Sequence, residues 1–150
     1  MAPRAKKPTT QKDKPQVRGP FIAERTLTDI ERDGSSVRIR IRKPRKDPAT
    51  GDYSCSFSIE GLGAQRVHDA WGMDSMQALQ NAFQAIRIEL APHAHRLRWA
   101  GGQDGWLGFP KVIPDIFGPS FTQRLEGLVE RETHRFARRL ESASRRTRRR

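Results

Sequence analysis

The chain has 150 residues, of which 35% are hydrophobic, so it can enclose one small core, and it carries a net charge of +12. Its single cysteine, Cys55, excludes a disulfide framework and a cysteine-based zinc cluster. No apolar run approaches the roughly 18 residues of a membrane span, and the N-terminus lacks the apolar segment of a secretory signal, so we expect a cytoplasmic protein.

The excess positive charge lies in the two ends of the chain. Residues 1–19 hold six basic residues and one acidic residue, a net +5, and residues 133–150 hold eight arginines and one glutamate, a net +7. Residues 20–132 hold 15 residues of each sign and are neutral. We therefore expect four regions: a disordered basic tail over 1–19, an α+β domain over 20–118, a C-terminal helix over 119–142, and a disordered arginine-rich tail over 143–150.

Four stretches between residues 20 and 72 have the alternation of β-strands. They are Phe21–Arg32, Ser36–Lys43, Tyr53–Ile59 and Val67–Trp71. The first stretch changes parity along its length and therefore needs a β-bulge. The pair Asp33-Gly34 predicts a two-residue hairpin turn, and short turns of this kind favour an antiparallel meander.

The two central strands separate apolar from polar side chains. In the second, valine and isoleucine alternate with Arg38, Arg40 and Arg42. In the third, apolar residues that include Cys55 alternate with serines, among them Ser58. One face of the sheet is thus expected to be apolar, and the other to carry arginine and serine.

Residues 73–91 are expected to form an amphipathic helix that covers the apolar face. Asp74 and Gln77 have the spacing of a capping box, and Pro92 ends the helix. The apolar stripe recurs at steps of three and four, through Met76, Leu79, Phe83, Ile86 and Leu90. The domain is therefore predicted to be a two-layer α+β fold, an antiparallel β-meander of about four strands under one helix.

Beyond Pro92 the pattern leaves two alternatives for Leu97–Trp99 and Trp106–Phe109, which are either two short strands or an irregular flap. A second helix is expected over residues 120–142, with Ser120 and Gln123 as its capping box. Its apolar face predicts a partner interface and offers a route to homo-oligomers. The interface residues are Phe121, Leu125, Leu128, Val129, Phe136 and Leu140.

Two basic surfaces are candidates for binding nucleic acid or another polyanion. The first lies on the outer sheet face and the adjoining loop, at Arg38, Arg40, Arg42, Lys43, Arg45 and Lys46. The second lies at the C-terminal end, at Arg138, Arg139, Arg145, Arg146, Arg148, Arg149 and Arg150. For both, a solvated surface with no partner is the competing interpretation, since charges normally face water. No exposed aromatic residue that could stack bases is evident beside the first.

The remaining polar residues do not predict catalysis. His93 and His95 could begin a metal site, but no cysteine or acidic cluster completes it. We find no catalytic motif and no defensible acid–base pair, so we expect a protein that is not an enzyme and needs no metal or cofactor. Three tryptophans, Trp71, Trp99 and Trp106, either complete the core or line a groove, and the core is favoured.

The run WGMDSMQALQ over residues 71–80, followed by Leu97-Arg98-Trp99 and then by LGFP over residues 107–110, resembles a family of small bacterial proteins grouped as a domain of unknown function. The similarity covers about residues 20–112, with the basic ends outside it. It implies a compact bacterial α+β domain and brings no established activity with it.

These observations favour a small non-enzymatic binding or scaffold protein. Its partner is expected to be a macromolecule, with nucleic acid or another polyanion contacted through the basic ends. The alternative is a protein-binding adaptor or immunity-type module that uses the neutral α+β domain.

Overall fold

The computed structural model describes residues 19–63, 66–103, 105–113 and 116–147. Most of the expected basic N-terminal tail, and the final residues Arg148, Arg149 and Arg150, lie outside these ranges. The chain divides into two units, one that ends at Pro110 and one that begins at Lys111. The boundary therefore comes earlier in the chain than the expected division after residue 118.

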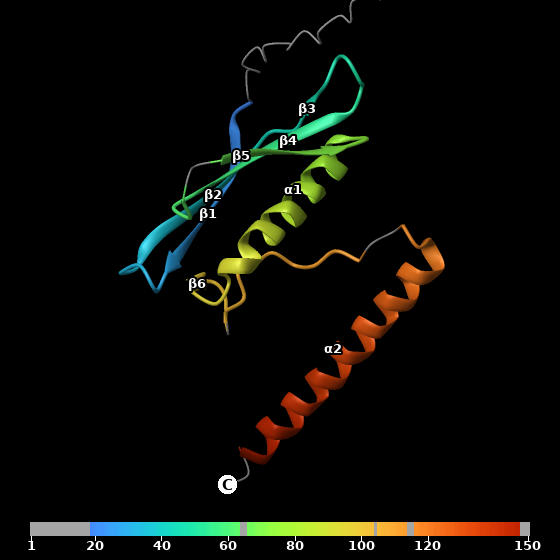
Figure 1. Cartoon of the computed structure of the whole chain (residues 1–150). Coiled ribbons are helices and arrows are strands. Elements are labelled where there is room, and N and C mark those ends of the chain that lie inside the picture. Colours follow the sequence, from blue (N-terminus) through green and yellow to red (C-terminus); the bar gives the residue numbers. More distant parts are fainter. Residues whose placement is uncertain (1–18, 64–65, 104, 114–115, 148–150) are drawn as a thin grey trace, which may run out of the picture. The chain divides into compact units, whose positions relative to one another are not determined.

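The first unit is built on one antiparallel sheet, along one face of which a helix lies (Figure 1). The order β6-β1-β2-β4-β5 confirms the expected meander and adds a short strand at one edge. The strands are β1 (Phe21–Asp29), β2 (Ser35–Arg42), β3 (Arg45–Lys46), β4 (Tyr53–Glu60), β5 (Arg66–Gly72) and β6 (Leu97–Arg98). The expected count of about four is thus low by the two-residue strands β3 and β6.

Strand β3 continues the line of β2 after a break at residues 43 and 44. Tyr53 and Ser54 of β4 pair with β3 on one side and with β5 on the other. Because β5 occupies the far edge of β4, β2 and β3 must share the near edge. The basic residues of β3 therefore lie along the same edge of β4 as β2, and the loop that leads on to β4 carries Asp47 and Asp52.

The β1–β2 hairpin confirms one expectation and corrects another. Its register shifts between Phe21 and Ala23, which is the predicted bulge. The connection is longer than the predicted two-residue turn, because β1 ends at Asp29 and β2 begins at Ser35. Asp33 and Gly34 do adopt the positive φ values of a tight turn, 50° and 72°, but they close a five-residue loop.

Helix α1 (Ser75–Leu90) packs on β4 and β5 and is followed by a 3-10 turn, η1 (Ala91–His93). The Asp74 carboxylate accepts from the Gln77 amide at 2.8 Å, and the Gln77 side chain accepts from the Met73 amide at 2.7 Å. The Asp74 half of the predicted capping box is therefore confirmed, while the Gln77 side chain reaches one residue further back, to Met73 rather than to the amide of Asp74.

The buried row of α1 is narrower than predicted. It consists of Ala78, Ala82, Ile86 and Leu90. Leu79 and Phe83 are only half-buried, and Met76, which was expected in the core, is exposed. A Cβ on Gly72 would lie 2.4 Å from the Ala78 nitrogen, so the helix start lies against the β5 backbone. Small residues must face the sheet at such a distance, which turns Met76 outward.

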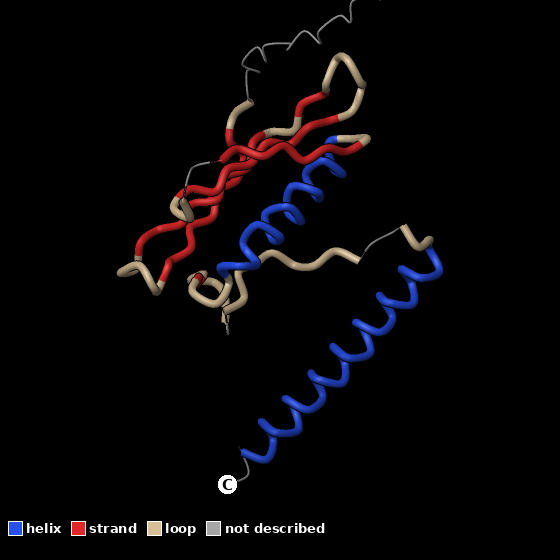
Figure 2. Tube along the Cα trace, viewed as in Figure 1, coloured by secondary structure: helices blue, strands red, loops and turns tan. Residues whose placement is uncertain are grey.

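Helix α2 (Pro119–Thr147) is a single uninterrupted helix (Figure 2). It starts at Pro119, a residue suited to a first helical position, so Ser120 lies inside the first turn and is not the predicted cap. It also runs past the expected end at residue 142, because arginine is a good helix former and cations suit a helix C-terminus. Among the described residues, no helix combines the length and the apolar composition needed to cross a membrane.

Candidate functional site

The outer face of the sheet carries the predicted arginine row, and its cations already have partners. Arg38 lies 3.6 Å from the Glu24 carboxylate, and Arg40 forms an ion pair with Glu60. Arg42 donates to the Gly19 carbonyl at 2.8 Å. This part of the face is therefore largely neutralised within the domain.

An aromatic ring lies beneath two of these arginines. The guanidinium carbons of Arg40 and Arg42 lie 4.3 and 3.8 Å from the centre of the Phe21 ring. Such stacking holds the cations flat against the sheet and limits their reach toward a ligand. Phe21 shares its parity along the chain with buried Leu27, and the bulge between Phe21 and Ala23 transfers its ring to the outer face, beside Arg42.

Further along the same face, an exposed indole stands in a row with a cation. In the register of the sheet, Arg45 pairs with Ser54, and Ser54 pairs with Trp71. Directly paired residues point to the same side, so all three side chains share the outer face. Trp71 is 45% exposed, which corrects its predicted place in the core. Neighbouring Lys43 and Lys46 are exposed as well.

Asp69 lies two residues from Trp71 along β5 and pairs in the sheet with Ser56. The Ser56 hydroxyl donates to its carboxylate. Ser58, which was expected to be exposed, is instead buried between Arg40 and Val67 of the flanking strands. The end of the outer face formed by Arg45, Ser54 and Trp71 combines an exposed cation with an exposed indole, and we call it the Trp71 row.

Helix α2 exposes the predicted apolar residues. Leu125 is half-buried, whereas the other five are between 38% and 62% exposed. These five are Phe121, Leu128, Val129, Phe136 and Leu140. At about 100° per residue they form one stripe, with Glu132 and Arg139 inside it. Glu132 accepts from Arg135 at 2.6 Å, which partly offsets its charge within the stripe.

Basic and acidic residues lie on opposite sides of this stripe. By the same helical spacing, one side holds Arg124, Arg131, Arg135, Arg138 and Arg145, and the other holds Glu126, Glu130 and Glu141. Of the predicted C-terminal cations, Arg138, Arg139 and Arg145 belong to α2 and are exposed. The side chain of Arg146 and residues Arg148, Arg149 and Arg150 lie outside the described part.

On the core side of the sheet, one arginine holds the segment that follows β6. Arg25 donates to the carbonyls of Leu107 and Gly108 at 3.0 and 2.7 Å. Its guanidinium lies 4.2 Å from the Trp99 ring and 4.7 Å from the Phe109 ring. Burial lowers the pKa of Arg25 below its usual value. Sequence reasoning missed this residue, although its strand parity matches that of buried Leu27.

Gly108 is required for this arrangement. Its φ is +79°, and a Cβ there would lie 2.3 Å from a nitrogen of Arg25 and 2.8 Å from the Trp99 ring. Gln84 of α1 donates to the Pro110 carbonyl at 3.0 Å and fixes the far end of the segment. Of the two alternatives for Trp106–Phe109, the structure therefore has an irregular segment fixed from both sides.

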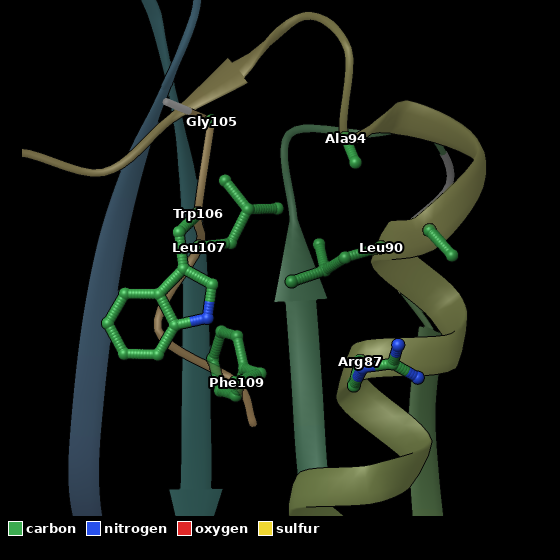
Figure 3. A pocket seen from close by; sticks show the side chains of 8 residues that line it. Arg87, Leu90, Ala94, Gly105, Trp106, Leu107 and Phe109 are labelled. Atoms are coloured by element: carbon green, nitrogen blue, oxygen red, sulfur yellow. The ribbon is translucent and has the colours of Figure 1, made fainter. Parts of the chain in front are cut away.

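Two pockets flank Phe109. The first, of about 220 Å³, lies between the end of α1 and residues 105–109, where exposed Trp106 faces buried Leu90 and the rim residue Arg87 (Figure 3). The second, of about 130 Å³, lies beside Arg25. Of the two alternatives for the tryptophans, the less favoured one therefore applies to Trp106, which is 53% exposed and lines a pocket, while Trp99 is half-buried against the core.

Cys55 lies on the inward face, as predicted, and is fully buried. Burial, with a smaller contribution from Asp69, raises the pKa of its thiol from 9.0 to about 11, so it stays protonated near neutral pH.

Of the two histidines that could begin a metal site, His95 is exposed and lies 3.6 Å from the Glu31 carboxylate. Across the described residues, no group of three or more histidine, cysteine or acidic side chains could hold a metal ion.

The comparison with protein families matches residues 23–111, which contain the sheet except for the first two residues of β1, together with α1, the Arg25 contacts and both pockets, but not α2. Its end agrees with the division of the structure after Pro110. No curated protein and no solved structure matches the chain. Since the match spans more than half of the 150 residues, the chain belongs to the family described as Domain of unknown function (DUF6968).

Proposed function

We propose that the protein is a non-enzymatic binding protein whose partner is single-stranded nucleic acid, held on the outer face of its sheet. The observation that carries this proposal is the Trp71 row, where an exposed indole, a serine hydroxyl and a guanidinium lie side by side. A sheet can hold a base on an aromatic ring and hold the adjacent phosphate with a cation.

The arginine side of α2 adds sequence-independent attraction. Arg124, Arg131, Arg138 and Arg145 recur every seven residues, about 10.5 Å apart along a helix. Guanidinium groups in such a line suit phosphates and carry no base information. Arg124 and Arg131 lie across the stripe from Glu126 and Glu130, whereas Glu141 stands one turn from both Arg138 and Arg145 and offsets part of their charge.

Titrations of the full chain with an unlabelled dT oligonucleotide and with a random duplex, at several salt concentrations, test the proposal. We expect the oligonucleotide to quench tryptophan fluorescence. Trp71→Ala should weaken its binding by about 1–3 kcal/mol, the usual value of one stacked base. Trp106→Ala removes another exposed indole and is the matched control. Equal effects of the two variants would overturn the proposal.

Charge variants separate the two basic surfaces. Replacing Lys43, Arg45 and Lys46 with glutamine removes three charges from residues 43–46, of which Arg45 is in register with Ser54 and Trp71, and replacing Arg131, Arg135 and Arg138 removes three from α2. Every phosphate that a variant no longer neutralises should lower the salt slope by about 1. The first variant should affect the single strand more than the duplex, whereas the second should affect both alike.

Self-association through α2 is a second candidate, favoured by the exposed apolar stripe. A parallel pair of helices would bring the arginine side of one copy next to the glutamate side of the other, which is a favourable arrangement of charge. Sedimentation of the full chain should then show a dimer that Leu128→Ser dissociates. A monomer at high concentration would contradict this candidate.

An adaptor role for the neutral domain is supported by the pocket at Trp106. Leu90, Leu107 and Phe109 form its apolar floor, and the indole and Arg87 stand on opposite sides (Figure 3). A pocket of this composition suits a large apolar side chain of a partner protein. A partner whose binding is lost on Trp106→Ala but kept on Trp71→Ala would favour this role over nucleic-acid binding.

A further inference from the structure

We propose that the smaller pocket beside Arg25 binds a small carboxylate with a branched apolar body. The site lies on the core side of β1 and shares no residue with the Trp71 row or α2. This proposal is therefore independent of nucleic-acid binding, and a failure of one would leave the other unaffected.

In the described part of the chain Arg25, like Arg42 and Arg98, donates to backbone carbonyls and pairs with no acid, whereas other arginines of this unit have acidic partners. Arg38, Arg40 and Arg96 each face a carboxylate, of Glu24, Glu60 and Asp29 respectively. In the part of the chain that the structure describes, no carboxylate forms an ion pair with Arg25; its partners are two carbonyls and two rings. The hydrogen bonds to both carbonyls use one terminal nitrogen, Nη1.

The pocket next to this cation is apolar. Its wall contains Arg25 together with Ala23, Ile39, Ile41, Phe83 and Phe109, and its volume is about 130 Å³. Glu24 also lines the pocket, but its side chain alternates to the outer face, where it lies 3.6 Å from Arg38.

The Arg25 cation and the apolar pocket wall together indicate which class of ligand the pocket suits. A partly desolvated guanidinium gains most from a full negative charge, and its planar fork matches a carboxylate. The Trp99 and Phe109 rings hold the plane of the guanidinium, so little rotational freedom remains to be lost on binding. Aliphatic and aromatic walls suit a short branched hydrocarbon body, and the cation repels amines.

Calorimetry and thermal denaturation of the full chain with isovalerate test the proposal. Isovaleramide has the same shape without the charge, and acetate has the charge without the body. We expect isovalerate to bind at least about tenfold more tightly than either, and to raise the melting temperature. Equal binding of the acid and its amide, or no binding of isovalerate at millimolar concentrations, would overturn the proposal.

Variants distinguish a ligand site from a structural contact. Ala23→Leu fills the pocket and leaves Arg25 in place, so it should abolish isovalerate binding while the protein stays folded. Ala94→Leu fills the neighbouring pocket at Trp106 and should leave binding unchanged. Arg25→Lys should retain some affinity through its charge. If Ala94→Leu and Ala23→Leu weaken binding equally, the ligand does not lie beside Arg25.

Discussion

The carboxylate of Asp29 lies 3.4 Å from Nε of Arg96, and the two side chains are 0% and 14% exposed. This ion pair joins the end of β1 to the residue that precedes β6, where Ile30 also donates to the Arg96 carbonyl at 2.9 Å. The second carboxylate oxygen of Asp29 accepts from the Glu31 amide at 3.1 Å. One buried acid therefore fixes both the hairpin loop and the chain that leads into β6.

Replacing this acid should strongly destabilise the domain. Asp29→Asn leaves Arg96 as a buried cation without a counter-charge, and breaking such a pair costs about 3–5 kcal/mol of unfolding free energy. Urea denaturation measures the loss. Arg32→Gln is the matched control, since Arg32 lies 4.0 Å from the same carboxylate but is 53% exposed. The control should cost less than about 1 kcal/mol; similar losses in both would contradict the assignment.

The buried thiol predicts a stability that falls in alkaline solution. Burial raises the folded pKa of Cys55 from 9.0 to about 11, so between these values the unfolded chain ionises while the folded chain does not. The contribution of the protonated thiol to the unfolding free energy is therefore fully present below pH 9. It is lost as the pH rises toward 11, at no more than about 1.4 kcal/mol per pH unit. The difference in pH dependence between the natural chain and Cys55→Ala isolates the contribution of this thiol from other titrations.

Thiol chemistry gives an independent check on Cys55. At pH 8 the folded protein should react with an aromatic disulfide reagent many times more slowly than the unfolded protein, because the thiol is both buried and protonated. Comparable rates in the two states would show that the inward position is not maintained in solution.

Arg25 should control the order of the segment that follows β6. Arg25→Met removes two hydrogen bonds from a charged donor, each worth about 1.5–3 kcal/mol, and leaves two carbonyls to find other partners. We expect faster hydrogen exchange over residues 105–110 and a smaller change in β2 and β4. Lysine at this position keeps the charge without the planar contacts, so it should restore only part of the protection.

The α1 cap predicts a smaller and local effect. Asp74→Ala removes the acceptor of the Gln77 amide and should lower the unfolding free energy by about 1 kcal/mol. Asp74→Asn retains an acceptor oxygen and should recover most of that loss. Chemical denaturation of the three proteins is sufficient, and an alanine variant as stable as the natural chain would show that the cap contributes nothing.

Much of the fold follows from local sequence patterns. Alternation predicted the facing of Val37, Ile39 and Ile41, and the shift of parity in β1 predicted its bulge. These predictions hold because side-chain direction in a strand has a period of two whatever the rest of the chain does. The Asp74 cap of α1 was equally predictable, since its donor and acceptor lie within four residues of one another.

Features set by distant contacts could not be predicted in the same way. Met76 satisfies the helical period but is turned outward, because Gly72 lets α1 approach β5 and only small side chains fit there. Trp71 lies outward because of its register with Ser54, which the strand's own sequence does not specify. The one local clue to Arg25 was a charged residue at the inward parity of Leu27. Its role could not be predicted, because the carbonyls that it binds lie 82 and 83 residues away in the chain.

That separation has a consequence for the protein's synthesis. Chain elongation proceeds at roughly 5–20 residues per second, so about 4–16 s pass between the synthesis of Arg25 and the synthesis of Leu107, whose carbonyl it binds. During that interval the β1–β2 hairpin and α1 can already form from chain that exists, whereas the wall that Phe109 gives to both pockets cannot. The nascent protein therefore acquires its sheet first and its binding pockets last.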